Sequence, residues 1–173
     1  SALQIALLQS GVKKSHEVIT PTITFISTIN AILYNSASPL FMDIDDYFNL
    51  DEEKTIEFLK LHTIFKKGKT YNKKTKKIIS ALIIVHTFGN AAKFEKLFSL
   101  CKRRKIMIIE DAAESLGTKY TKGIFKNKFT GTLGLIGCTS FNGNKIITSG
   151  GGGAIISNDK YIIQDSKHLI NQA

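Results

Sequence analysis

The hydrophobic and polar positions of the chain follow two periods, one typical of buried strands and one typical of amphipathic helices. The runs IISALIIV and IMII are almost wholly apolar, as expected of parallel strands that are buried on both faces. The segment AAKFEKLFSLCKRRK has apolar residues at helical spacing, and its basic end suits the negative C-terminal pole of a helix. The pattern predicts strands that alternate with helices.

Other segments extend this order. We expect further strands at EVIT, PLFMDID, IGCTSF and GAIIS, and further helices at SALQIALL, TFISTINAILYNSA, EEKTIEFLKLH and DKYIIQDSKHLINQA. Asp51 is placed to cap the helix that follows it. In the TFISTINAILYNSA helix we expect one apolar face, made of Phe25, Ile29, Ile32 and Leu33. This order predicts an α/β domain with a mostly parallel central sheet flanked by helices.

The charge of the chain is concentrated in one place. The net charge is +10, and residues 66–77 carry seven lysines. Such a run could touch nucleic acid or anionic lipid, or it could be a solvated hairpin. We favour the hairpin, because Tyr71 is the one aromatic residue in the run and arginines are missing from it. No apolar run reaches the length of about 18 residues that a membrane helix needs.

The two cysteines, Cys101 and Cys138, lie in unrelated settings. Neither has a metal-type partner at short spacing, so we expect no metal site and no disulfide framework. A reducing cytoplasm is the expected location.

Polar residues follow the predicted strands at the points where the strands end. In open α/β sheets, ligands bind at the carboxyl ends of the strands. These positions hold hydroxyls, an aromatic ring, acids and a lysine: Thr22, Thr24, Phe25, His86, Thr87, Glu110, Asp111, Glu114, Ser140, Asn142, Asn144 and Lys145.

Asp111 is the sharpest of these candidates, since it follows a fully apolar run and precedes two alanines. The local sequence favours a helix cap over a site carboxylate. A ribose-binding acid of a nucleotide-binding α/β protein is disfavoured, because no G-x-G-x-x-G stands about 20 residues earlier. For His86, a core or loop histidine is favoured over a contact with Asp111.

Lys145 stands in SFNGNKIITSGGGG, among serine, asparagine and glycine. Its hydroxyl and backbone N–H neighbours could bind an anion. Most lysines are surface residues, but a lysine in this setting, together with an acid, suits pyridoxal phosphate.

Several blocks of the chain, in one order, resemble a known family. HEVITPTITFISTINAI, SASPLFMDID, VHTFG, IEDAAESLG and GLIGCTSFNGNKIITSGGGG match motifs of the DegT-type aminotransferases of nucleotide-sugar biosynthesis. These are pyridoxal-phosphate enzymes of aspartate-aminotransferase-like fold. Within the family, the sequence is similar to the enzymes that aminate UDP-4-keto sugars on routes to bacillosamine and legionaminic acid.

The resemblance implies roles for particular residues. Lys145 resembles the lysine that binds the cofactor as a Schiff base, and Asp111 resembles the acid that pairs with the ring nitrogen. Phe25 resembles the aromatic residue stacked on the cofactor ring; a helix-core position is the alternative.

Further cofactor contacts are implied in the same way. Glu114 resembles the residue near the phenolic oxygen of the cofactor. Ser140 resembles a phosphate ligand, and Ser1 and Ala2 resemble the end of a phosphate-binding turn.

The implied reaction moves an amino group from an amino acid, glutamate in this family, to the 4-keto group of a UDP-linked deoxy sugar. Residues 1–173 correspond to part of the large cofactor-binding domain, without its amino-terminal segment and without the small carboxy-terminal domain. We expect a homodimer, no nucleic acid or membrane partner, and poor folding or low activity of the piece alone.

Two alternatives stay open at this point. A related sugar dehydratase uses the same cofactor, but such enzymes carry a histidine where this chain has Lys145. A non-enzymatic basic binding module could use residues 66–77.

Overall fold

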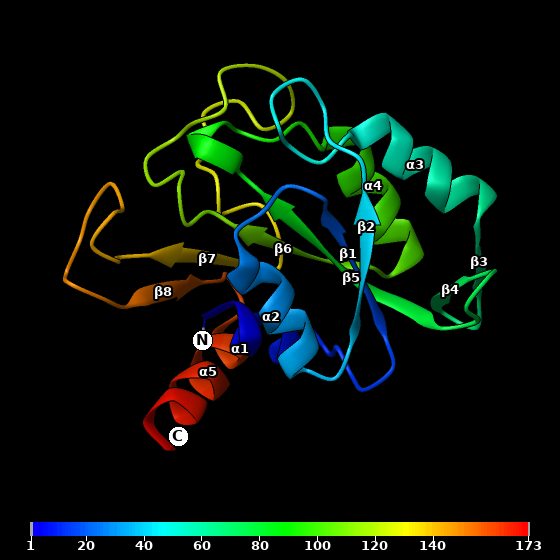
Figure 1. Ribbon diagram of the computed structural model, residues 1–173, viewed down its shortest axis with the longest axis horizontal. Helices are drawn as coiled ribbons and strands as arrows, with labels where there is room; N and C mark the ends of the chain where they lie inside the picture. Colours follow the sequence, from blue (N-terminus) through cyan, green and yellow to red (C-terminus); the bar gives the residue numbers. More distant parts are fainter. Residues whose placement is uncertain (1, 173) are drawn as a thin grey trace.

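The apolar run IISALIIV forms the central strand of the sheet. This strand, β5 (Ile78–Val85), pairs in parallel with β1 (Glu17–Pro21) on one side and with β6 (Met107–Asp111) on the other. Its last five residues are all buried, as the near-continuous apolar sequence predicts. The computed structural model describes residues 2–172 (Figure 1).

The sheet has eight strands, six of them in the order β2-β1-β5-β6-β7-β8. The last strand, β8, runs antiparallel to β7, and the hairpin β3–β4 joins the beginning of β5 in antiparallel fashion. The remaining strands are β2 (Ser38–Met42), β3 (Thr63–Lys66), β4 (Lys69–Asn72), β7 (Ile136–Ser140) and β8 (Gly153–Ile156).

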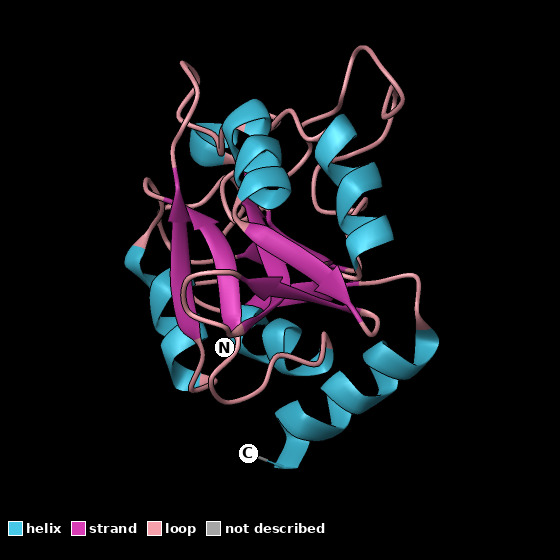
Figure 2. Cartoon of the chain, turned by 90° about the vertical axis from the view of Figure 1, so that its right-hand side faces the viewer, coloured by secondary structure: helices cyan, strands magenta, loops and turns pink. Residues whose placement is uncertain are grey.

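Helices cover both faces of the sheet (Figure 2). They are α1 (Ala2–Gln9), α2 (Ile26–Tyr34), α3 (Glu52–Leu61), α4 (Glu95–Arg104) and α5 (Lys160–Gln172), with a short 3-10 turn, η1 (Thr87–Gly89). Helices α3 and α4 lie together on one face, whereas α1 contacts α2 and α5 on the other (Figure 1).

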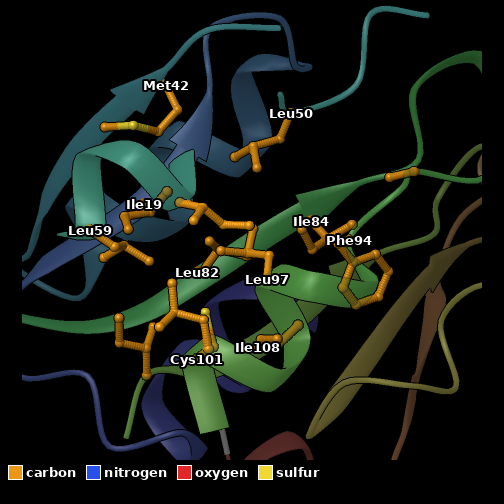
Figure 3. Packing of buried hydrophobic residues seen from close by; sticks show 14 of the residues in the cluster. Ile19, Met42, Leu50, Leu59, Leu82, Ile84, Phe94, Leu97, Cys101 and Ile108 are labelled. Carbon is orange, nitrogen blue, oxygen red and sulfur yellow. The ribbon is translucent and has the colours of Figure 1, made fainter. Parts of the chain in front are cut away.

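Each face of the sheet has its own core, because neighbouring strand residues point to opposite faces. In β1, Ile19 packs with α3 and α4, and its neighbour Val18 packs with α1 and α2. In β5, Leu82 packs in the core on the α3 and α4 face, and its neighbour Ile83 packs in the core on the α1 and α2 face. Figure 3 shows the first core, in which Leu82 of the sheet meets Leu97 of α4.

The structure confirms the predicted fold class and the predicted order of strands and helices. Asp51 caps α3 as expected, since its carboxylate accepts the N–H of Lys54 at 3.0 Å. The lysine-rich run is largely the β3–β4 hairpin and the turn after it.

The prediction for the buried face of α2 is wrong in part. Ile32 is buried, but Phe25 and Leu33 are 71% and 52% exposed. The face that meets the sheet is Thr28, Ala31 and Ile32, so a threonine occupies a position expected to be apolar. Helix α4 also begins later than its alanine-rich start suggests, at Glu95.

Both cysteines carry free thiols and are buried. Among residues 2–172, no helix is long and apolar enough to cross a membrane.

Leu82→Ala tests the first core. Leu82 is fully buried between β5 and α4, so we expect the free energy of unfolding of the whole protein to fall by about 2–5 kcal/mol in urea titrations. Leu61→Ala is the control, because Leu61 is 57% exposed and its loss should change stability by no more than about 0.5 kcal/mol. Equal effects of the two variants would contradict this account of the core.

Candidate functional site

A cavity of about 990 Å³ opens where the parallel strands β1, β5, β6 and β7 end. This is the edge of an α/β sheet at which ligands bind. The lining comes from segments far apart in the chain. It includes eleven of the residues singled out above: Ala2, Thr24, Phe25, His86, Thr87, Asp111, Glu114, Ser140, Asn142, Asn144 and Lys145.

Asp111 is the last residue of β6 and is 6% exposed. One carboxylate oxygen, Oδ1, accepts the N–H of Ala113 at 3.2 Å, and the other, Oδ2, accepts the hydroxyl of Thr28 at 2.9 Å. Burial raises the pKa of Asp111, although these two hydrogen bonds and the positive charge of Lys145 act in the opposite direction. Turns follow Asp111, so it caps no helix and the helix-cap interpretation is wrong.

Lys145 lies in the loop between β7 and β8, and its side chain is only 15% exposed. The backbone N–H donates to the carbonyl of Asn142 at 3.0 Å, which fixes the local turn. The ammonium Nζ lies 3.6 Å from Oε1 of Glu114. That distance is an ion contact rather than a hydrogen bond, so the amine keeps its hydrogen-bonding capacity.

Glu114 connects Lys145 to a second loop. Its other oxygen, Oε2, accepts the backbone N–H of Phe88 at 2.9 Å. Phe88 has a left-handed backbone, with φ of 54°, a conformation that costs energy for a bulky residue. The Glu114 carboxylate therefore holds the η1 turn and the lysine loop at one side of the cavity.

Phe25 precedes α2 and presents its ring at the cavity. It is 71% exposed, so the helix-core alternative is wrong. An aromatic ring in this position offers a flat apolar face to whatever occupies the cavity.

Ser140 and Ala2 line another part of the same cavity, whereas Ser1 lies outside the described residues. The Ser140 hydroxyl oxygen accepts a long hydrogen bond, 3.4 Å, from the N–H of Asn142. Thr87 and Thr139 also line this cavity, and their hydroxyl oxygens are buried without a hydrogen-bond partner among residues 2–172.

His86 is a buried histidine with both ring nitrogens in hydrogen bonds. Its Nδ1 accepts the N–H of Ala92 at 3.1 Å, so Nε2 carries the hydrogen that faces Glu110 Oε2 at 3.0 Å. Its side chain does not bind Asp111; only its backbone N–H donates to the Asp111 carbonyl, at 3.1 Å. The core-histidine prediction is confirmed.

Glu110 anchors the loop at 131–134 from inside the protein. Oε2 accepts the N–H of Gly131, and Oε1 accepts those of Leu133 and Gly134. Burial by itself raises the pKa of Glu110, but the hydrogen bonds from His86 and from the loop outweigh it and lower the pKa. This loop packs directly on β7, because a side chain at Gly137 would overlap the Gly131 carbonyl.

Over residues 1–173 the chain matches the DegT/DnrJ/EryC1/StrS aminotransferase family. The chain belongs to this family.

Its relatives in this aminotransferase family include a GDP-perosamine synthase of Escherichia coli O157:H7, 37% identical over 99% of this chain and 42% of that protein. They also include a UDP-4-amino-4,6-dideoxy-N-acetyl-β-L-altrosamine transaminase of Campylobacter jejuni, 33% identical over 98% of this chain and 39% of that protein. The chain thus spans about two fifths of the length of these relatives.

A solved structure of a DegT/DnrJ/EryC1/StrS aminotransferase from Brucella abortus has the same fold. It superposes with a TM-score of 0.83 at 30% identity, over 97% of this chain and 42% of that chain. The predicted aspartate-aminotransferase-like fold of this family is confirmed.

Enzymes of the DegT family use pyridoxal 5'-phosphate, and the residues of the cavity fit that group. A buried carboxylate, Asp111, can face a protonated ring nitrogen, and the amine of Lys145 can reach an aldehyde. The hydroxyl of Ser140, which lines the cavity, is suited to an anion such as a phosphate.

The sequence did not predict two contacts near the site: the hydrogen bond from Thr28 to Asp111, and the hydrogen bonds by which Glu110 anchors the loop at 131–134. Thr28 could have been noticed as a polar residue on the apolar face of a helix. Glu110 was seen as a residue after a strand, but its partners Gly131, Leu133 and Gly134 are brought to it only by the fold.

Glu110→Gln tests this buried anchor. An amide has one acceptor oxygen instead of two, so at neutral pH we expect the variant to be less stable by about 1–3 kcal/mol. The native pKa of Glu110 is lowered, so ionised Glu110 adds stability above its ordinary pKa of about 4.3, and that stability is lost as the pH falls through the native value. Urea titrations from neutral to acidic pH should show the difference between wild type and variant shrinking.

The exposed Glu57→Gln is the matched control. A wild-type advantage that stays constant across the same pH range would contradict an ionised Glu110.

Proposed function

We propose that the whole protein is a pyridoxal-phosphate-dependent aminotransferase that moves an amino group from an amino acid to a keto group of a nucleotide-linked sugar. One observation carries this proposal: in a chain of this family, Lys145 and the buried carboxylate of Asp111 line one cavity at the carboxyl ends of the strands. Lysine at this position favours transamination over the dehydration chemistry of histidine-bearing relatives.

When bound, the cofactor supplies an aldehyde and an aromatic ring that accepts electrons from the substrate. Asp111 would hold the ring nitrogen in its protonated form. Without a cation beside it, burial raises the pKa of this carboxyl; a positive ring nitrogen would offset that cost and keep Asp111 ionised. The charge pair is therefore most favourable when the site is loaded.

Lys145 would hold the cofactor through its aldehyde, and its free amine would act as the general acid and base that moves a proton. The contact with Glu114, at 3.6 Å, keeps the amine at the side of the cavity without tying it down. Glu114 would approach the phenolic oxygen of the cofactor, and Phe25 would stack on its ring.

For the phosphate group of the cofactor, Ser140 would donate its hydroxyl. Ser1, which lies outside the described residues, and Ala2 are proposed as further phosphate contacts. Ala2 and Ser140 both line the cavity, which supports this assignment.

The substrate we propose is a UDP-linked deoxy sugar with a 4-keto group, and the amino donor is glutamate. The UDP-sugar transaminase of Campylobacter jejuni, 33% identical to this chain, supports a UDP-linked substrate. The GDP-perosamine synthase, 37% identical, supports a GDP-linked sugar as the alternative substrate. The names of both relatives specify a nucleoside diphosphate joined to an amino sugar.

The whole protein is proposed as a cytoplasmic homodimer with no nucleic-acid or membrane partner. Residues 1–173 form part of its large cofactor-binding domain, and other segments and the second subunit complete the substrate pocket.

Lys145→Ala tests the cofactor assignment in the whole protein. We expect the variant to lose the visible absorbance of lysine-bound cofactor, and its transamination rate to fall at least about 10²–10⁴-fold, because the residue that moves the proton is gone. Absorbance spectra after dialysis against pyridoxal phosphate, with an activity assay, measure both.

Lys122→Ala is the matched control, since Lys122 is exposed and lies outside the lining of the cavity. A Lys145→Ala protein with the wild-type spectrum would refute the assignment of Lys145 as the cofactor-binding lysine.

A substrate panel tests the finer proposal. With glutamate as donor, the UDP-4-keto sugar should give a kcat/KM at least about tenfold above that of the GDP-4-keto sugar, equivalent to about 1.4 kcal/mol of discrimination. Formation of 2-oxoglutarate and of the amino sugar, followed by chromatography, provides the readout. Preference for the GDP sugar would refute UDP specificity and leave the aminotransferase proposal intact.

A further inference from the structure

Thr28 is a buried polar residue on the apolar face of α2. Its side chain is fully buried, and it shares that face with Ala31 and Ile32. A threonine in a helix commonly points its hydroxyl to solvent or bonds it to the carbonyl four residues earlier. Thr28 instead donates its hydroxyl hydrogen to Asp111 Oδ2, 83 positions away in the chain, at 2.9 Å.

A second threonine extends this contact to the cavity. Thr24 lines the cavity, and its hydroxyl donates to the hydroxyl oxygen of Thr28 at 2.8 Å. A hydroxyl has one hydrogen, so the donors run in one direction, from Thr24 through Thr28 to the Asp111 carboxylate. Hydrogen bonds in such a chain polarise one another, which strengthens the bond that reaches the carboxylate.

We propose that Thr28 is a positioning residue for the reaction, which holds the Asp111 carboxylate ionised and correctly rotated toward the ring nitrogen of the cofactor, with Thr24 as its supporting donor. This inference rests on the proposed function, because it concerns how Asp111 meets that cofactor.

The geometry of Asp111 supports this role. Ala113 donates to Oδ1 and Thr28 to Oδ2, so each oxygen has one donor fixed by the protein and a lone pair left. A carboxylate held at both oxygens cannot rotate freely. Both donors bind the ionised form better than the neutral acid, and they oppose the burial that favours the neutral acid.

Other charged and titratable groups around Asp111 do not provide that restraint. The positive charge of Lys145 acts on it by charge alone, and the Cys138 thiol lies on the neighbouring strand β7, where Cys138 pairs with Asp111. Glu114 is engaged with Lys145 and Phe88, and Glu110 with His86 and the loop at 131–134. Thr28 is the side chain that hydrogen-bonds to the Asp111 carboxylate among residues 2–172.

The test uses three variants of the whole protein loaded with pyridoxal phosphate labelled with ¹⁵N in the ring. Thr28→Val keeps the shape and removes the hydroxyl, Thr28→Ser keeps the hydroxyl, and Thr24→Val removes only the supporting donor. The ¹⁵N shift of the ring nitrogen reports its protonation directly, fluorescence titration gives the cofactor dissociation constant, and urea unfolding of the apoprotein gives stability.

For Thr28→Val we expect the ring-nitrogen signal to move toward the unprotonated position and the dissociation constant to rise about tenfold, the size of one lost hydrogen bond to a charged group. Thr28→Ser should keep the wild-type signal, and Thr24→Val should change it in the same direction as Thr28→Val but less.

A Thr28→Val protein that is less stable but has the wild-type ring-nitrogen signal and cofactor affinity would overturn the inference, since the threonine would then be merely structural. If Thr28→Val does not fold, Thr24→Val decides in the same way, with a wild-type signal counting against the inference. Wild-type protein that forms no lysine-bound cofactor would instead refute the proposed function.

Discussion

The site depends on one buried negative charge, the carboxylate of Asp111. A carboxylate that leaves water must recover its lost hydration from fixed donors and from nearby positive charge. The fold provides the N–H of Ala113, the hydroxyl of Thr28 and the charge of Lys145, each from a different segment. These partners meet only because β6 ends where the neighbouring parallel strands also end and leave a cavity.

Two adjacent acids on β6 have separate tasks because strand residues alternate between the faces of the sheet. Asp111 points to the cavity, where its charge can meet a ligand. Glu110 points the other way, to His86 and the backbone of the loop at 131–134, and its oxygens are fully used by those donors. One carboxylate thus stabilises the loop that packs beside β7, while the other keeps lone pairs for chemistry.

Local sequence predicted the fold well because its strands carry strong patterns. IISALIIV is apolar enough to indicate burial on both faces, and Asp51 stands at the start of a clear amphipathic helix. The prediction was weaker for α2, where Phe25 and Leu33 have helical spacing but point away from the core. Apolar spacing describes a helix and cannot tell whether an apolar face meets the sheet or a cavity.

The sequence by itself determined the order of the elements, the acid and the lysine at strand ends, and the family resemblance, because these lie in short contiguous motifs. Only the tertiary structure showed that Phe25 faces the cavity, that Asp111 caps no helix, and that Thr28 and Glu110 have the partners they do. Hydrogen bonds between residues 21 to 83 positions apart are decided by how strands and helices pack, and no local pattern indicates which distant donor will face a given carboxylate.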